Sequence, residues 1–187
     1  MPAQVFLASL IIVFLTELGD KTMIATILLS AEHRQPSLVL IASLAALATS
    51  TFIAIIIGVV LSSALPLDLI IYLSGVIFIV LGLYTLFKKE ESEETTENTQ
   101  ITFLSMFSLV LVSELGDKSQ LAILAIAAQS LFPAFVFIGA VTGFLLLNSI
   151  GAFSGDKIGE NLPMNAIRAF TGIVFIIIGT LVLFRMM

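Results

Sequence analysis

Residues 17–22 read ELGDKT, and residues 114–119 read ELGDKS. The two copies lie 97 residues apart, and the same shift aligns the two halves of the chain without a gap. Prolines between apolar segments and glycines within or beside them coincide under that shift: Pro36 with Pro133, Pro66 with Pro163, Gly58 with Gly155, Gly75 with Gly172, and Gly82 with Gly179. Because chance does not match a motif, prolines and glycines together, we interpret the chain as a tandem repeat.

The composition is that of a membrane protein. Of the 187 residues, 59% are hydrophobic and 11% charged, and the mean hydropathy is +1.16. Soluble domains contain about 25% charged residues, so an ordinary soluble domain and a disordered chain are excluded. The net charge of −5 excludes nucleic acid as a partner. The chain has no cysteine and a single histidine, His33, which excludes disulfides, thiolate sites and polyhistidine zinc or copper sites.

Six apolar segments are long enough to cross a lipid bilayer as helices, since a span needs about 20 residues. Their continuous apolar runs contradict the alternating pattern of a β-barrel. The first segment contains charged residues and follows no basic region, so we interpret it as a retained span and not as a signal peptide. The sequence therefore predicts an all-α membrane protein with spans at residues 4–30, 38–62, 67–87, 101–127, 134–154 and 163–186.

Each repeat holds three predicted spans, so the second copy must enter the membrane from the opposite side. This predicts two inverted three-helix repeats, at residues 1–87 and 101–187, joined by an acidic linker at residues 88–100. Basic residues near the span ends determine orientation. One side carries Arg34, Lys88, Lys89, Lys157 and Arg168, and the other carries Arg185. We therefore expect a cytoplasmic linker and external termini.

Four carboxylates lie near the centres of the first and fourth predicted spans: Glu17, Asp20, Glu114 and Asp117. Each charge in mid-membrane costs about 2.5–3.5 kcal/mol, which makes a functional site the default interpretation. Residues three and four apart share a helix face, so we expect each motif's Glu, Asp and Lys to project to one side. The glycine between the carboxylates permits local unwinding. Inverted symmetry then brings the two motifs together near the midplane.

The charge of such a cavity suits a divalent cation. Four carboxylates and two lysines leave −2, and oxygen ligands favour Ca²⁺, Mn²⁺ or Mg²⁺. Weaker auxiliary candidates are Lys21, Thr22, Lys118, Ser119, Thr51 and Asn148, the last two at equivalent positions of spans two and five. Met23 and Gln120 break the symmetry beside the motifs. We expect no prosthetic group, only the transported ion.

At these motifs the sequence resembles the Golgi manganese/calcium transporter family, also called calcium/proton antiporter-2 and related to the lysine-exporter superfamily. Its doubled E-x-G-D-[KR]-[TS] signature matches both hexapeptides, and the resemblance covers the whole chain. It implies export of Mn²⁺ or Ca²⁺ from the cytoplasm in exchange for protons, with Glu17, Asp20, Glu114 and Asp117 as ligands. The chain lacks the long N-terminal targeting region of organellar members, so we expect a prokaryotic plasma membrane.

Three other functions are weighed against a divalent-cation antiporter. An exporter of a cationic organic solute such as lysine would be expected to place aromatic residues around the carboxylates, and no Trp or Tyr lies near either motif. A metal-dependent membrane enzyme, such as a phosphotransferase, needs its site near the interface. A passive channel would be obstructed by the lysines. The sequence leaves open the preferred cation, the proton stoichiometry, and whether the protein forms a homodimer.

Overall fold

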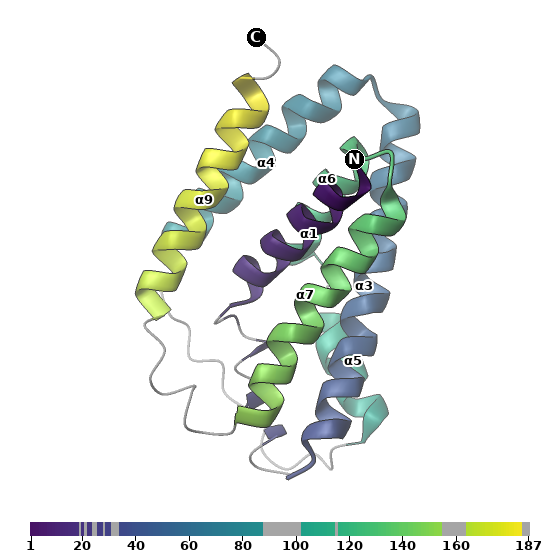
Figure 1. Ribbon diagram of the computed structural model, residues 1–187, viewed down its shortest axis with the longest axis vertical. Coiled ribbons are helices and arrows are strands. Elements are labelled where there is room, and N and C mark those ends of the chain that lie inside the picture. The colour runs from purple at the N-terminus through teal and green to yellow at the C-terminus, as the bar shows by residue number, and fades with distance from the viewer. Residues whose placement is uncertain are drawn as a thin grey trace.

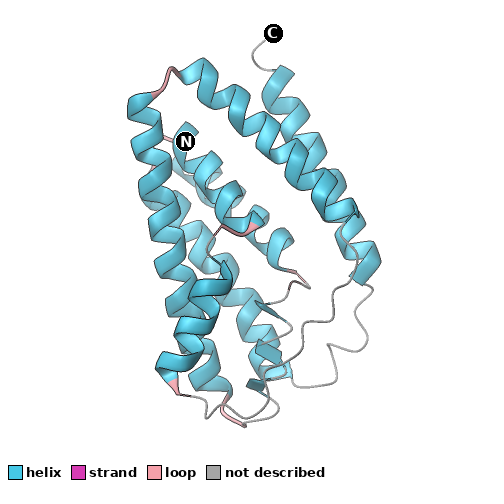
Figure 2. Cartoon of the chain, turned by 180° about the vertical axis from the view of Figure 1, so that it is seen from behind, coloured by secondary structure: helices cyan, strands magenta, loops and turns pink. Residues whose placement is uncertain are grey.

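The computed structural model describes residues 1–18, 20, 22–23, 26–27, 29–30, 34–87, 102–114, 116–154 and 164–184. Its ordered elements are all helices, and the described residues include no strand (Figures 1 and 2). The helices are α1 (Pro2–Glu17), α3 (Pro36–Ala64), α4 (Leu67–Phe87), α5 (Phe103–Glu114), α6 (Lys118–Gln129), α7 (Pro133–Ser154) and α9 (Met164–Phe184). The protein is therefore an all-α bundle, as the composition predicts.

Helix starts follow from the prolines. Pro36 opens α3 and Pro133 opens α7, where the missing N–H would have had no partner within the helix and the fixed φ angle suits the first turn. Pro66 directly precedes α4. Helices α3, α4 and α7 contain no charged residue except Asp68. Helical geometry pairs the backbone N–H and C=O groups within each helix, as a bilayer requires.

Within the described residues, three helices are long and apolar enough to cross a membrane: α3, α4, and residues Pro133–Phe153 of α7. The apolar helices Pro2–Glu17, Phe103–Glu114 and Ala169–Phe184 are shorter. The predicted continuous span at residues 101–127 differs from the structure, because α5 ends at Glu114 and α6 begins at Lys118. The first span likewise breaks, since α1 ends at Glu17 although residues 22–23, 26–27 and 29–30 are again helical.

Helices α4 and α9 form an antiparallel pair that is held close by glycines. A Cβ on Gly82 would lie 2.7 Å from the Gly172 carbonyl oxygen, and one on Gly75 would lie 3.1 Å from that of Gly179. Between these contacts Phe78 meets Phe175 edge to face, with ring centroids 5.6 Å apart. Small residues at these positions let two membrane helices approach closely.

The remaining helices pack as α1 against α7, and as α3 against α5, α6 and α7. Figure 1 shows α1 beginning and α9 ending at the same end of the bundle. The main buried cluster joins α1, α3, α5, α6 and α7 around Leu47, Ile123 and Phe144. Where α1 and α5 end in this packing, the side chains of Glu17 and Glu114 are buried.

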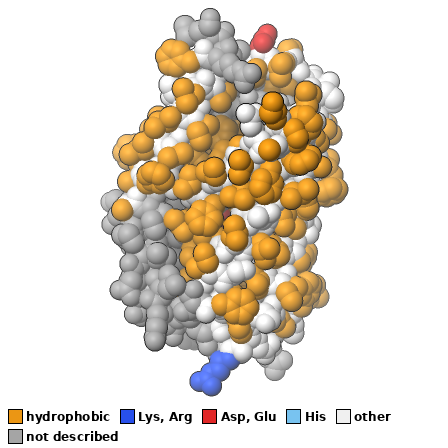
Figure 3. Space-filling model, in the orientation of Figure 1, with side chains coloured by type: hydrophobic (Ala, Val, Ile, Leu, Met, Phe, Trp, Pro, Cys, Tyr) orange, Lys and Arg blue, Asp and Glu red, His pale blue; other side chains and the backbone are white. Residues whose placement is uncertain are grey.

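The outer surface is apolar. Large hydrophobic side chains such as Phe52, Val112 and Ile177 are exposed on several helices. Figure 3 shows many hydrophobic side chains on the described part of one face, with a red group protruding at one end and a blue group at the other. An exposed apolar band between charged ends is the surface expected of a protein surrounded by lipid.

Candidate cation-binding site

Both motifs interrupt their helices in the same way. The Asp20 backbone N–H donates to the Glu17 carbonyl oxygen (3.0 Å), and the Asp117 N–H donates to that of Glu114 (3.1 Å). Gly116 has a φ of +82°, a left-handed conformation that glycine adopts without steric cost. The local unwinding expected from the motif glycine is therefore present in the second motif, where both Glu114 and Asp117 are described.

Three of the four predicted ligands come together. One carboxylate oxygen each from Glu17, Glu114 and Asp117 lies within 4.8 Å of the other two. Oxygens on opposite sides of a cation bound at about 2.2–2.5 Å would be about 4.4–5 Å apart, so this spacing suits one divalent ion. Glu17 is 1% exposed and Glu114 is fully buried. The cluster therefore takes ligand groups from both repeats, in the interior of the bundle.

The fourth predicted ligand, Asp20, has a different partner. The Lys118 ammonium lies 2.6 Å from the Asp20 carboxylate, so the pair joins the two motifs. The sequence predicted that the lysine of each motif lies on the same helix face as the glutamate of that motif. In the structure, Lys118 of the second motif instead pairs with Asp20 of the first. The reason is the helix break, because residues four apart are neighbours only on a continuous helix. Lys21, the equivalent of Lys118, lies outside the described residues.

The hydroxyls of the two motifs behave differently. Thr22 donates a hydrogen bond across the repeats to Glu114 Oε1. Its counterpart Ser119 is fully buried, and its hydroxyl has no hydrogen-bond partner. Both carboxylate oxygens of Glu17 are also buried without a donor. Buried polar groups are nearly always satisfied, so Glu17 is placed to take a cation or a proton.

The auxiliary residues on α3 and α7 are both buried. Asn148 accepts a hydrogen bond from Thr26 (3.1 Å) and donates to the Phe144 carbonyl (2.9 Å). The Thr51 hydroxyl is buried without a hydrogen-bond partner. The Thr51 hydroxyl is therefore open to a ligand, and the Asn148 carbonyl oxygen keeps one lone pair besides the one that accepts from Thr26.

Two polar residues escaped the sequence reasoning as contributors to this region. Thr26 is fully buried and holds Asn148, and Ser50 is buried next to Thr51 with no hydrogen-bond partner. Their repeat counterparts are Ile123 and Leu147. Residues matched in both halves do not include them. The sequence feature that indicates them is a polar residue in one repeat where the other repeat has an apolar residue at the equivalent position.

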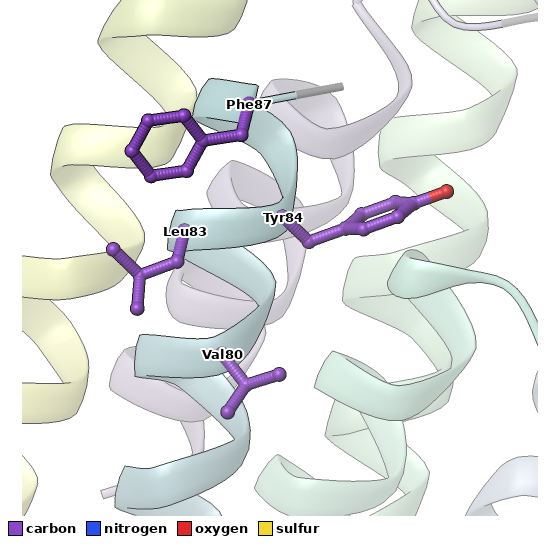
Figure 4. Close-up of a pocket in the computed structure, with 4 residues that line it drawn as sticks. All are labelled: Val80, Leu83, Tyr84 and Phe87. Carbon is purple, nitrogen blue, oxygen red and sulfur yellow. The ribbon is translucent and has the colours of Figure 1, made fainter.

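A depression on the outer face of α4 is not a competing site. It is lined by Val80, Leu83, Tyr84 and Phe87 and is open to the surroundings. Figure 4 shows Phe87 and Tyr84 pointing to opposite sides of α4, so the side chains do not converge on one point. The lining contains no carboxylate to bind a divalent cation. The acidic cluster is the feature of the described structure with suitable ligand chemistry.

Comparison with protein families gives one match that covers nearly the whole chain. The family described as "Divalent cation/proton antiporter GDT1" matches residues 5–93 and 102–187. The two matched stretches correspond to the two halves of the tandem repeat and leave out part of the acidic linker. No solved structure gives a significant match to the chain.

Several curated proteins are similar to the chain. It is 27% identical over 175 residues to a Vibrio cholerae protein named "Putative manganese exporter", with 93% of this chain and 88% of that protein aligned. It is 29% identical over 196 residues to "Protein PAM71-homolog, chloroplastic" of Arabidopsis thaliana, covering 84% of this chain and 54% of that protein. It is 38% identical over 79 residues to "GDT1-like protein C186.05c" of Schizosaccharomyces pombe, covering 42% and 30%.

Proposed function

The chain belongs to the GDT1 family of divalent cation/proton antiporters, and on that premise we propose that it exports Mn²⁺, or else Ca²⁺, from the cytoplasm in exchange for protons. As a member of this family it is a membrane transporter and not an enzyme. The name of the Vibrio relative favours Mn²⁺. That relative also favours a prokaryotic plasma membrane as the location.

The observation that carries the proposal is the meeting of Glu17, Glu114 and Asp117 within 4.8 Å. Asp20 and Lys118 neutralise each other, so these three carboxylates supply the negative charge that attracts a divalent ion. Hard oxygen ligands suit Mn²⁺ and Ca²⁺. We assign Asp20 to the site as well, as a ligand that Lys118 holds until a cation arrives.

Coupling to protons follows from the same groups. A carboxylate that binds a proton cannot bind the cation with the same oxygen lone pair, so the two substrates compete for one set of oxygens. Glu17 is the residue we expect to exchange them, because neither of its oxygens has a hydrogen-bond donor. An antiporter needs such mutually exclusive binding, since simultaneous binding would carry both substrates in one direction.

We further propose six spans in two inverted repeats, with Glu17 and Glu114 at their interface. The support is a set of contacts that exchange under the 97-residue offset. The repeat equivalents of Gly75 and Gly179 are Gly172 and Gly82, and both pairs are in contact. Phe78 and Phe175 are repeat equivalents of each other, and they also contact each other. Because α4 and α9 run antiparallel, the axis relating them lies across the helices, which is the arrangement of inverted-repeat transporters. One repeat would then rock against the other around the cation site.

Flux into proteoliposomes tests the function. Purified protein should transport Mn²⁺ or Ca²⁺ from one side of the membrane when the opposite side is the more acidic one. A protonophore that collapses the pH gradient should slow the metal flux. Parallel measurements with Mg²⁺ and with radiolabelled lysine determine selectivity and test the organic-cation alternative. Lysine transport without divalent-cation transport would contradict the proposal.

A further inference from the structure

The buried hydroxyls of α3 have no hydrogen-bond partners, whereas three of its four exposed hydroxyls do. Thr49, Ser62 and Ser63 are exposed, and each donates to a carbonyl of its own helix at 2.7–2.8 Å. Ser43, Ser50 and Thr51 are at most 2% exposed, and their hydroxyls have no partner. A hydroxyl facing lipid must bond to its own backbone. The free interior hydroxyls therefore point to polar partners inside the bundle, such as water or an ion.

These hydroxyls occur in one repeat and not in the other. Ser43 and Ser50 correspond to Ala140 and Leu147, which are both fully buried on α7. Outside α3, Ser30 and Gln120 are also buried, and their side-chain polar atoms have no partner. They correspond to Ala127 and Met23, both buried. At each of these four pairs of equivalent positions, one repeat has a buried polar side chain without a hydrogen-bond partner, and the other repeat has an apolar side chain.

The free hydroxyls extend from one end of the bundle toward the acidic cluster. Ser43 lies two turns after the start of α3, and Ser50 lies two turns further, about 10 Å along the same helix face. Ser30 lies at the same end of the bundle, because only residues 31–35 separate it from α3. The corresponding residues at the opposite end are Ala127 and Ala140.

The inner end of this row lies beside the motif of the second repeat. Leu147, the counterpart of Ser50, forms a buried cluster with Met23 and Ile27. Phe14 and Leu18, which lie on either side of Glu17 in the sequence, pack against this cluster. Helices α3 and α5 contact each other as α7 and α1 do. The repeat relation therefore sets Ser50 next to the end of α5, where Glu114 lies.

We propose that Ser43 and Ser50, with Ser30 at the mouth and Gln120 at the inner end, line a hydrated access route from the α3 N-terminal end to the acidic cluster. Water and a partly hydrated divalent cation are its occupants. The equivalent path past Ala140 and Leu147 is dry. The direction in which the cation moves through this route rests on the proposed function. With the linker in the cytoplasm, the cation enters the site from the cytoplasm through the polar route.

Single cysteines test the route, because the chain has no native cysteine. The variants are Ser43→Cys and Ser50→Cys, with Ala140→Cys and Leu147→Cys as controls at the matching repeat positions. The purified proteins in detergent are treated with 2-aminoethyl methanethiosulfonate, and modification is followed by intact-protein mass spectrometry. The cysteine thiolate, which forms in contact with water, attacks the sulfenyl sulfur of the reagent, so that a mixed disulfide forms and methanesulfinate leaves. We expect modification at positions 43 and 50 to be at least about ten-fold faster than at 140 and 147.

Mn²⁺ provides a second measurement on the same variants. Saturating Mn²⁺ should slow modification of Ser50→Cys, which is close to the cluster, more than that of Ser43→Cys. Rates equal within about two-fold at all four positions, or faster at 140 and 147, would overturn the route. If a cysteine variant does not fold, Ser43→Ala replaces it. That variant should keep equilibrium Mn²⁺ binding and lose most of the uptake rate, and unchanged uptake would count against the route.

The two proposals fail in different ways. Asymmetric labelling in a protein that does not carry Mn²⁺ or Ca²⁺ would remove the proposed function and keep the route. Symmetric labelling in a protein that transports Mn²⁺ would remove the route and keep the function.

Discussion

Lys118 of the second motif forms an ion pair with Asp20 of the first, with 2.6 Å between the ammonium nitrogen and the carboxylate oxygen. The two side chains are only 15% and 13% exposed. The pair joins elements nearly a hundred residues apart and neutralises one of the four motif carboxylates. It thereby connects the stability of the bundle to the charge of the site.

A double-mutant cycle measures this pair. Lys118→Gln and Asp20→Asn should each lower the unfolding free energy by about 1–3 kcal/mol, because each leaves a partly buried charge without its partner. The double variant should lose at least about 1 kcal/mol less than the sum of the singles. Thermal unfolding in detergent gives the values, with the exposed Arg34→Gln as control. Additive losses would show that the pair contributes nothing to stability.

Glu17→Gln and Glu114→Gln should each abolish transport, and the double variant should be no worse than either single. The reason is that both carboxylates contribute to one ion, and groups acting as a unit are strongly non-additive. Initial Mn²⁺ flux in proteoliposomes is the measurement. Asp68→Asn is the matched control, because Asp68 is an exposed carboxylate at the start of α4. Two half-active singles with additive losses would indicate two independent sites.

Transport should fall as the pH is lowered on the side that loads the metal. Protons compete with the cation for Glu17, Glu114 and Asp117, so acid on that side should raise the KM for Mn²⁺ and leave the maximal rate nearly unchanged. Acid on the opposite side should accelerate release and raise the maximal rate. Flux with the two pH values varied independently separates these effects. A flux independent of pH on both sides would exclude proton exchange at these carboxylates.

Gly82→Ala and Gly179→Ala should each destabilise the protein by about 1–3 kcal/mol, because the added Cβ meets a backbone oxygen at 2.7 Å or less. A carbonyl in a helix cannot move aside as a flexible side chain can. Gly151→Ala is the control: its nearest atoms would lie at 3.5 Å, an ordinary contact. Melting temperatures in detergent provide the comparison. Equal melting temperatures for the three variants would show that α4 and α9 can move apart at little cost in free energy.

Orientation is tested by labelling residue 92 in the acidic linker. Ser92→Cys should react with a membrane-impermeant maleimide only after intact cells are opened, because five of the six basic residues near the predicted span ends lie on the linker's side. Arg34 lies on that side as well, so Arg34→Cys should behave identically. Labelling of either variant in intact cells would reverse the proposed orientation.

Much of the architecture could be predicted from local sequence. The uninterrupted apolar runs predicted helices, and Pro36 and Pro133 stand where α3 and α7 begin. The predicted glycine effect was also right in the second motif, since Gly116 adopts a positive φ beside the helix break. These features depend on single residues or neighbours in the chain, which is why periodicity and composition were sufficient.

The sequence by itself determined the membrane class, the repeat and the four carboxylates. Only the tertiary structure decided that Glu17, Glu114 and Asp117 form one cluster while Asp20 pairs with Lys118. The helical spacing rule predicted contacts within each motif, but a break three residues long redirects the side chains that follow it. Contacts between the motifs depend on how α1, α3, α5, α6 and α7 pack, and that packing is set by buried shapes along whole helices, which no local pattern encodes.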